Sequence, residues 1–223
     1  LRQKAASGFP GRAMREILRR CAGYVDATSQ TYVDTDRGPA ALLEGIAPED
    51  THYPGDILHN LAFAHMLTAD TRWADKAIAM VRMMVAEGGR SDLLEQAAQS
   101  GQLAVAYDLL HAVLDDTTRQ AVRTYLRIAA VEGYRRRRLG TMGAYIWGLG
   151  TNRFLHGFEK YVFALAAVFD PATDWPLLEE AAGLARRSLH LGFDDGGAIY
   201  EGPSYGWGDA EWISMPSEIL RRA

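Results

Sequence analysis

The chain has 223 residues, of which 48% are apolar, 23% are charged and 10% are aromatic. This composition supplies one sizeable core or two small ones, and it excludes a disordered tail, a collagen-like repeat and a disulfide-rich mini-protein. With 24 basic residues against 28 acidic ones, the formal net charge is −4, which provides no global positive field for nucleic acid. We therefore expect any anionic ligand to be bound by a local group of residues.

The single cysteine, Cys21, cannot form an intramolecular disulfide, and its helical spacing from Met14 and Leu18 predicts a small buried side chain. The chain contains no apolar run of 18 residues and no signal peptide, so we expect no contact with a membrane. It begins at Leu1 and stops within a helical-looking stretch at 217–223, and we expect a piece processed or cut from a longer protein.

Apolar residues recur at spacings of three and four along most of the chain, which is typical of helices, and a period of two is almost absent. The pattern predicts an N-terminal helix followed by successive helix pairs. The connections within the pairs are so short that the partners must be antiparallel neighbours. The helices are expected over residues 57–67 and 73–84, 92–114 and 115–134, and 152–169 and 174–189.

Residues of the kind that cap helices mark several of these boundaries. Residues 69–71 separate the first two helices, and Asp92 with Glu95 resembles a capping box at the start of the third. Asp174 precedes the last helix, and Pro176 stands in its first turn, where proline is well tolerated.

The helix pairs carry more apolar surface than one narrow stripe, so each pair needs partners on both sides, as in a solenoid, a toroid or a large bundle. Residues 26–53 are rich in Thr, Ser, Gly and Pro and predict a long loop with short helices at most, either functional or disordered. We therefore expect an all-α chain, with an N-terminal helix and long loop over 1–53 and a helical-hairpin domain over 54–223.

The most unusual passage is residues 193–208, where five glycines and a proline interrupt the helical period among aromatic and acidic residues. Glycine lets a backbone turn sharply and approach a ligand closely, and the face of Trp207 is a suitable platform for a sugar ring. The alternative is a tight β-like turn between two helices, with the tyrosines packed onto the core. Composition alone leaves both interpretations open.

A second passage, residues 145–156, ends at the start of an expected helix. Asn152 and His156 are four residues apart, so both can project from one face near the end where unpaired backbone N–H groups favour an anion. A carboxylate or an oxyanion can be bound in such a place. The alternative is that Asn152 caps the helix and His156 packs sideways with a satisfied hydrogen bond.

The stretch formed by Asp195-Gly196-Gly197, Glu201-Gly202 and Tyr205 resembles the Asp-Gly-x-x-x-Glu-Gly-x-x-Tyr stretch of heparinase II/III-like polysaccharide lyases. Residues 62–77 and 104–110 are similar to the helical-toroid core of those enzymes and of related alginate lyases.

In that family an asparagine at the start of a toroid helix precedes the tyrosine, and here Asn152 and Tyr205 are 53 positions apart. The resemblance covers about residues 54–210. It implies an incomplete (α/α) toroid of antiparallel helix hairpins and a periplasmic or secreted location. The family normally continues into a β-sandwich domain that closes the cleft, and no β-sandwich is expected within this chain. We expect either a truncation before that C-terminal domain or a diverged relative without it.

Such enzymes cleave acidic polysaccharides by β-elimination at a uronic acid. Loss of the C5 proton beside the carboxylate creates an enolate-like charge, so the site needs a neutralising donor, a base for the proton and an acid for the departing O4 oxygen. The resemblance implies that Tyr205 is the base, the acid or both, with its pKa lowered from about 10 by cationic or donor neighbours. Asn152 would neutralise the carboxylate, and His156 or Arg153 can add positive charge.

Arg153 is a departure, because family members often have Trp, Asn or His at that position. No Cys/His group has zinc spacing and no phosphate-binding loop occurs, so we expect no metal, no cofactor and no nucleotide. The run 135–138 of four arginines is either solvated at a helix end or in contact with sulfate and carboxylate groups. The residues assigned to binding of an acidic polysaccharide are Arg153, Trp207, Glu201, Tyr145 and Trp147.

Two other functions fit the same residues. A glycoside hydrolase on a similar toroid would use two of Asp194, Asp195 and Glu201 as its acid/base pair. A non-catalytic helical module would bind carbohydrate or protein without turnover.

Overall fold

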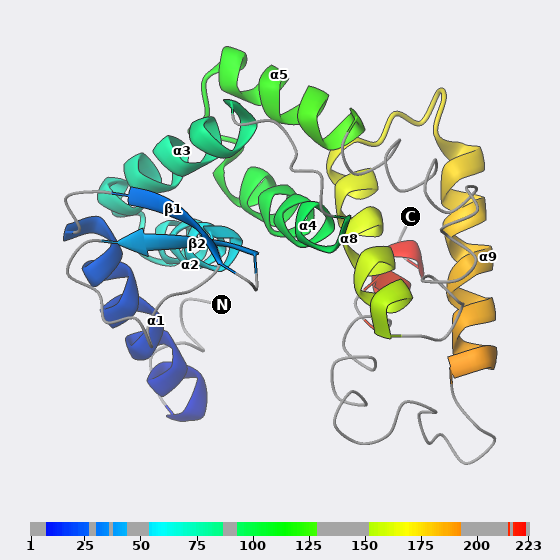
Figure 1. Cartoon of the computed structure of the whole chain (residues 1–223), viewed down its shortest axis with the longest axis horizontal. Coiled ribbons are helices and arrows are strands. Elements are labelled where there is room, and N and C mark those ends of the chain that lie inside the picture. The colour runs from blue at the N-terminus through cyan, green and yellow to red at the C-terminus, as the bar shows by residue number, and fades with distance from the viewer. Residues whose placement is uncertain are drawn as a thin grey trace. The chain divides into compact units, whose positions relative to one another are not determined.

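The structure, a computed structural model, describes residues 8–26, 30–35, 38–43, 54–86, 93–128, 152–192, 214 and 216–221. Most of these residues are helical, as the sequence predicts (Figure 1). The helices with assigned bounds are α1 (Gly8–Asp26), α2 (Pro54–Thr68), α3 (Thr71–Ala86), α4 (Leu93–Leu110), α5 (Asp116–Tyr125), α8 (Asn152–Val168) and α9 (Trp175–Gly192).

The chain divides into two compact units, each made of two segments of the chain. The first unit comprises residues 1–88 and 105–122, and the second comprises 89–104 and 123–223. Because the divisions fall inside α4 and α5, each of these helices contributes residues to both units. The first unit includes residues on both sides of position 53, and the domain boundary expected there stays a prediction.

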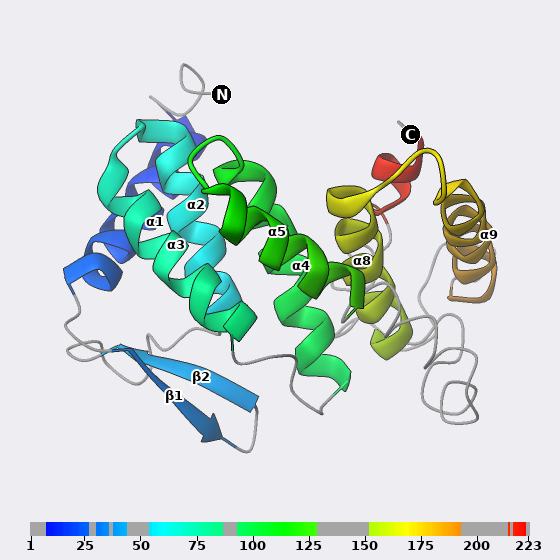
Figure 2. The ribbon, with the colours of Figure 1, turned by 90° about the horizontal axis from the view of Figure 1, so that it is seen from above.

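In the first unit, α1 packs against α2 and α3, which also pack against each other (Figure 2). Each helix turns one apolar face inward, because apolar residues three and four positions apart share a face. The predicted burial of Cys21 is confirmed. Fully burying a side chain of leucine size stabilises a fold by roughly 1.5–3 kcal/mol. The most buried residues of the three helices are Cys21, Tyr24, Ile57, Leu58, Leu61, Ala62, Ala64, Ala77, Met80 and Val81.

The predicted break between α2 and α3 is confirmed at Ala69 and Asp70. Ala69 has a φ of 61°, in the left-handed region, and its N–H donates to the carbonyl of His65 at 2.7 Å, which ends α2. The Oδ1 atom of Asp70 accepts the backbone N–H of Arg72 at 3.0 Å. Asp70 therefore caps α3, since it satisfies one of the N–H groups that a helix start leaves unpaired.

Residues 30–43 differ from the sequence expectation. In place of a long loop with short helices at most, β1 (Gln30–Thr35) and β2 (Gly38–Leu43) pair antiparallel, from Gln30 opposite Leu43 to Thr35 opposite Gly38. β1 contains Thr, Tyr and Val, which favour strands, but β2 has no apolar alternation because Ala and Leu follow one another. The described part of the chain is mostly helical, consistent with the expected all-α class, and the hairpin contradicts only the loop with short helices at most that was expected over residues 26–53.

The connection from α4 to α5 lies in the first unit. α4 ends at Leu110 rather than at the expected residue 114, and the N–H of Leu114 still donates to the carbonyl of Leu110 at 3.1 Å. Asp115 caps α5, because its Oδ1 accepts the N–H of Thr118 at 2.8 Å. Its Oδ2 accepts Nη2 of Arg82 in α3 at 2.7 Å. The hydrogen bonds from Thr118, followed by that from Arg82, lower the pKa of Asp115 well below its usual range.

In the second unit, α8 and α9 begin at the residues that the sequence predicts, within one position. Buried side chains fill the C-terminal half of α8. The two consecutive helices expected over 152–189 are matched by α8 and α9 with the short segment between them, and their pairing as an antiparallel hairpin stays a prediction. The largest fully buried residues of this unit include Phe158, Tyr161 and Leu165 of α8 and Leu126 after α5.

Asp174 organises the segment between α8 and α9. Its side chain is only 1% exposed, and its two oxygens accept Nη1 and Nη2 of Arg127 at 2.6 and 2.5 Å. The carboxylate also accepts the N–H of Asp170 at 3.0 Å and the hydroxyl of Thr173 at 3.2 Å. The bidentate contact with Arg127 is the main reason that the pKa of Asp174 falls to about 2.

Candidate functional site

Three of the predicted site residues are in α8. Asn152 is the first residue of this helix, Arg153 is the second, and His156 begins the second turn. The backbone places Asn152 and His156 at positions i and i+4, which share one helix face, as the sequence predicts. The side chains of residues 152–157 are outside the described part of the chain, so their proposed roles stay predictions.

The remaining predicted site residues lie outside the described residues altogether. Their proximity to Asn152 and their roles stay predictions. They are Tyr145, Trp147, Glu201, Tyr205 and Trp207, the alternative carboxylates Asp194 and Asp195, and the arginine run 135–138.

The start of α8 has the physical character that an anion site requires. The first backbone N–H groups of a helix have no partner within the helix, and the helix dipole places partial positive charge at this end. α8 has 17 residues, and its later turns are held by buried Phe158, Tyr161 and Leu165. The direction of the helix axis, and with it the position of Asn152, is therefore fixed by the core of the second unit.

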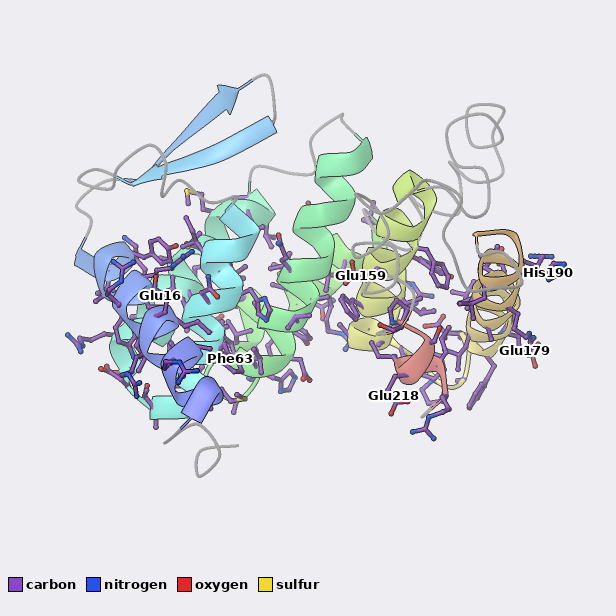
Figure 3. All side chains as sticks on the ribbon, turned by 90° about the horizontal axis from the view of Figure 1, so that it is seen from below. Glu16, Phe63, Glu159, Glu179, His190 and Glu218 are labelled. Carbon is purple, nitrogen blue, oxygen red and sulfur yellow. The ribbon has the colours of Figure 1, made fainter. Side chains whose placement is uncertain are left out.

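Glu159 is a further polar residue on the same face of α8, which the sequence analysis did not select. It follows Asn152 by seven positions and His156 by three, and it is 4% exposed. Figure 3 labels Glu159 on α8. Burying a carboxylate is costly unless hydrogen bonds or charges compensate it, so such a group seldom occurs in a core without a specific role. The available signal was that Glu159 is the single acidic residue of α8, between Phe158 and Lys160.

Positions 152, 156 and 159, which share one face of α8, are thus an asparagine, a histidine and the buried glutamate Glu159. An amide and a helix N-terminus can bind a carboxylate or oxyanion, and an imidazole can exchange a proton near neutral pH. The carboxylate of Glu159 can accept a hydrogen bond and thereby hold the donor group in one orientation. These are the groups that acid/base chemistry on an anionic substrate requires.

Among the residues described here, no three His, Cys, Asp or Glu side chains lie close enough together to hold a metal ion. In the same part of the chain, no helix has the length and apolar character needed to cross a bilayer. Comparison of the chain with models of protein families and with curated proteins gives no match. The functional interpretation therefore depends on the residues themselves.

Proposed function

We propose that this protein is the helical part of a polysaccharide lyase, an incomplete (α/α) toroid that cleaves a uronate-containing acidic polysaccharide by β-elimination. The observation that supports this function is that α8 begins at Asn152 and that positions 152, 156 and 159, the last of them the buried Glu159, share one helix face. The glycine-rich motif ending at Tyr205 supplies the base in this proposal. The polymer is the partner of the site, and a periplasmic or secreted location accords with such a substrate.

In the proposed reaction, the amide of Asn152 and the N-terminus of α8 bind the uronate carboxylate. Neutralising this carboxylate makes the neighbouring C5 proton more acidic, because the charge that develops when the proton leaves is stabilised. Tyr205, as the tyrosinate, takes the C5 proton, the C4–O4 bond breaks as the C4–C5 double bond forms, and the resulting Tyr205 hydroxyl gives that proton to the departing O4 oxygen. His156 adds positive charge beside the carboxylate.

The reaction is tested by incubating the full chain with alginate, heparan sulfate and chondroitin sulfate. The unsaturated sugar formed by elimination absorbs in the ultraviolet, so we expect absorbance to rise with one of these polymers. Because a positioned base contributes about 100-fold or more to a rate, Tyr205→Phe should lower the rate by at least that factor. Tyr200→Phe, in the same glycine-rich stretch, is the matched control and should leave the rate nearly unchanged.

The alternative functions give different results in the same experiment. A hydrolase would release reducing ends without ultraviolet absorbance and would be inactivated by Glu201→Gln. A non-catalytic module would bind the polymer without turnover, insensitive to Tyr205→Phe but sensitive to Trp207→Ala. Normal elimination by the Tyr205→Phe variant would overturn the assignment of this residue.

A further inference from the structure

We propose that the exposed face of α9 is an interface between two copies of this chain, which pack their α9 helices antiparallel about a two-fold axis. Four apolar residues recur along this face at intervals of three, four and seven positions. They are Trp175, Leu178, Ala182 and Leu189. Such intervals are typical of the seam along which one helix packs on another. The proposal depends on α9 alone and is independent of the proposed function.

The four residues form an apolar stripe on a side of α9 that the core leaves uncovered. At about 100° of rotation per residue they fall within an arc of about 60°, and 175 to 189 span about 21 Å of the axis. Trp175 is 49% exposed and Leu189 is 44% exposed. Leu178 and Ala182, between them, are half-buried. A row of apolar side chains in water is unfavourable, so a second helix that covers the stripe gains free energy.

The core side of α9 adjoins this stripe and is already packed. Its buried residues are Leu177, Ala181, Leu184 and Ala185. The core therefore fixes the rotation of the helix about its own axis, and the stripe is held in place before any partner binds.

The charges beside the stripe complement a second copy of α9 that runs in the opposite direction. Glu179, labelled in Figure 3, and Arg186 are both exposed. Helix geometry places them on the same edge of the stripe, within about 40° of Trp175. Along the axis, Glu179 lies about 4.5 Å before Ala182, and Arg186 lies about 6 Å after it.

A two-fold axis through Ala182, perpendicular to the two helices, makes use of this spacing. It brings Glu179 of each copy to within about 1.5 Å of the level of Arg186 in the other copy, on the same edge of the seam. Because the interface is two-fold symmetric, the ion pair forms twice. The stripe and the two charges together are thus self-complementary, and this identifies a second copy of the chain as the partner.

A parallel pair of helices does not have this complementarity. A two-fold axis along the helices would place each Glu179 at the level of the other Glu179, on opposite edges of the seam, so no ion pair would form. In the antiparallel pair, Trp175 lies opposite Leu189, and Ala182 lies opposite itself at the centre. Small side chains at a crossing let two helices approach closely, and a Cβ atom added at Gly183 would meet nothing within 4 Å.

The interface is small, so we expect a weak dimer that dissociates on dilution. A strip about 21 Å long and about 10 Å wide covers roughly 200 Å² of each copy, against roughly 800 Å² per partner in a standard interface. We therefore expect a dissociation constant above about 1 μM.

The test measures self-association of the full chain by sedimentation velocity between about 1 μM and 1 mM. Arg186→Glu replaces both ion pairs by pairs of like charge, so we expect this variant to dimerise about tenfold more weakly than the wild type. Arg187→Glu is the matched control, because Arg187 is exposed and lies about 120° away from Trp175 around the helix. This control makes the same change in net charge and should weaken dimerisation less than about twofold.

A charge swap tests the antiparallel arrangement itself. Glu179→Arg alone should weaken dimerisation about as much as Arg186→Glu alone. An equimolar mixture of these two variants should dimerise about as well as the wild type, because each mixed pair regains two ion pairs of opposite charge. If Glu179→Arg does not fold, as judged by circular dichroism, Arg186→Glu against Arg187→Glu tests the same face.

A wild-type chain that stays monomeric at every concentration would overturn the proposal. So would equal dimerisation by Arg186→Glu and Arg187→Glu, or a mixture of the two folded single variants that associates no better than each alone. None of these outcomes bears on the lyase function, which is judged by ultraviolet product.

Discussion

The connection between α2 and α3 and the connection between α8 and α9 both join consecutive helices, but they are stabilised differently. The first connection depends on residues that are neighbours in the sequence. Ala69 ends α2, and Oδ1 of Asp70 caps α3 because it accepts the backbone N–H of Arg72 at 3.0 Å. The second uses a buried carboxylate, Asp174, whose main partner, Arg127, is 47 residues away in the sequence. A local connection is visible in a short stretch of sequence, whereas a long-range one is visible only in the folded chain.

Asp174→Asn should give the largest loss of stability among the changes at these two connections. The substitution removes the charge that compensates Arg127 and weakens the contacts to Asp170 and Thr173, so we expect the free energy of unfolding to fall by about 2–3 kcal/mol. Chemical denaturation monitored by circular dichroism measures this change. Asp70→Asn is the matched variant in the connection between α2 and α3. An equal loss in the free energy of unfolding in that variant would contradict the conclusion that the two connections are stabilised differently.

The same carboxylate should make stability depend on pH. Its ordinary pKa of 3.8 falls to about 2 in the fold because of Arg127, so its contribution is fully present above about pH 4. That contribution is lost as the pH falls through 2, where the carboxyl is protonated in the folded state as well. The stability difference between the wild type and Asp174→Asn should therefore shrink between pH 5 and pH 2. A difference that stays constant over this range would mean that the ion pair is not its source.

Ala69→Gly should stabilise the protein. An L residue with a Cβ atom is strained at a positive φ of 61°, and glycine is not. After allowing for the greater freedom of glycine in the unfolded chain, we expect a gain of about 0.5–1 kcal/mol. Ala79→Gly on the exposed face of α3 is the control, and it should cost about 1 kcal/mol because glycine is a poor helix former. A loss of stability at both positions would show that the strain at Ala69 is relieved in solution.

Arg72→Gln should have the smallest effect. Nη2 of Arg72 lies 2.9 Å from Asp70, but the arginine side chain is 65% exposed, and exposed ion pairs add little in water. The backbone N–H at this position still reaches Asp70 in the variant. Thermal melting at low and high salt should give nearly the same midpoint for both proteins, and a large drop would mean that the ion pair, rather than the cap, stabilises this turn.

The sequence predicts the helices well because their signals are local. The break at 69–71 and the start of α9 after Asp174 combine residue types that disfavour helix interiors with apolar periods on either side. The hairpin at 30–43 was missed, because β2 lacks the alternation that identifies a strand. The partnership of Arg127 with Asp174 had no local signal at all.

The candidate site was predictable to a smaller degree. The position of Asn152 at the start of α8 follows from the onset of an apolar helical period and agrees with the structure. Glu159 was missed because a single Glu within a helix is ordinarily a surface residue, and only the packing around α8 shows that it is 4% exposed. The role of Tyr205 depends on the resemblance and on the enzymatic test.

The burial of Cys21 gives the protein a natural probe of its own motion. The thiol is the sole cysteine of the chain and is 0% exposed, and burial raises its pKa to about 12. A thiol reagent reacts with an accessible thiolate, so in the native state labelling requires α1 to separate transiently from α2 and α3. When this opening is rare and reclosing is fast, the labelling rate reports the free energy of local opening, without any added chromophore or isotope.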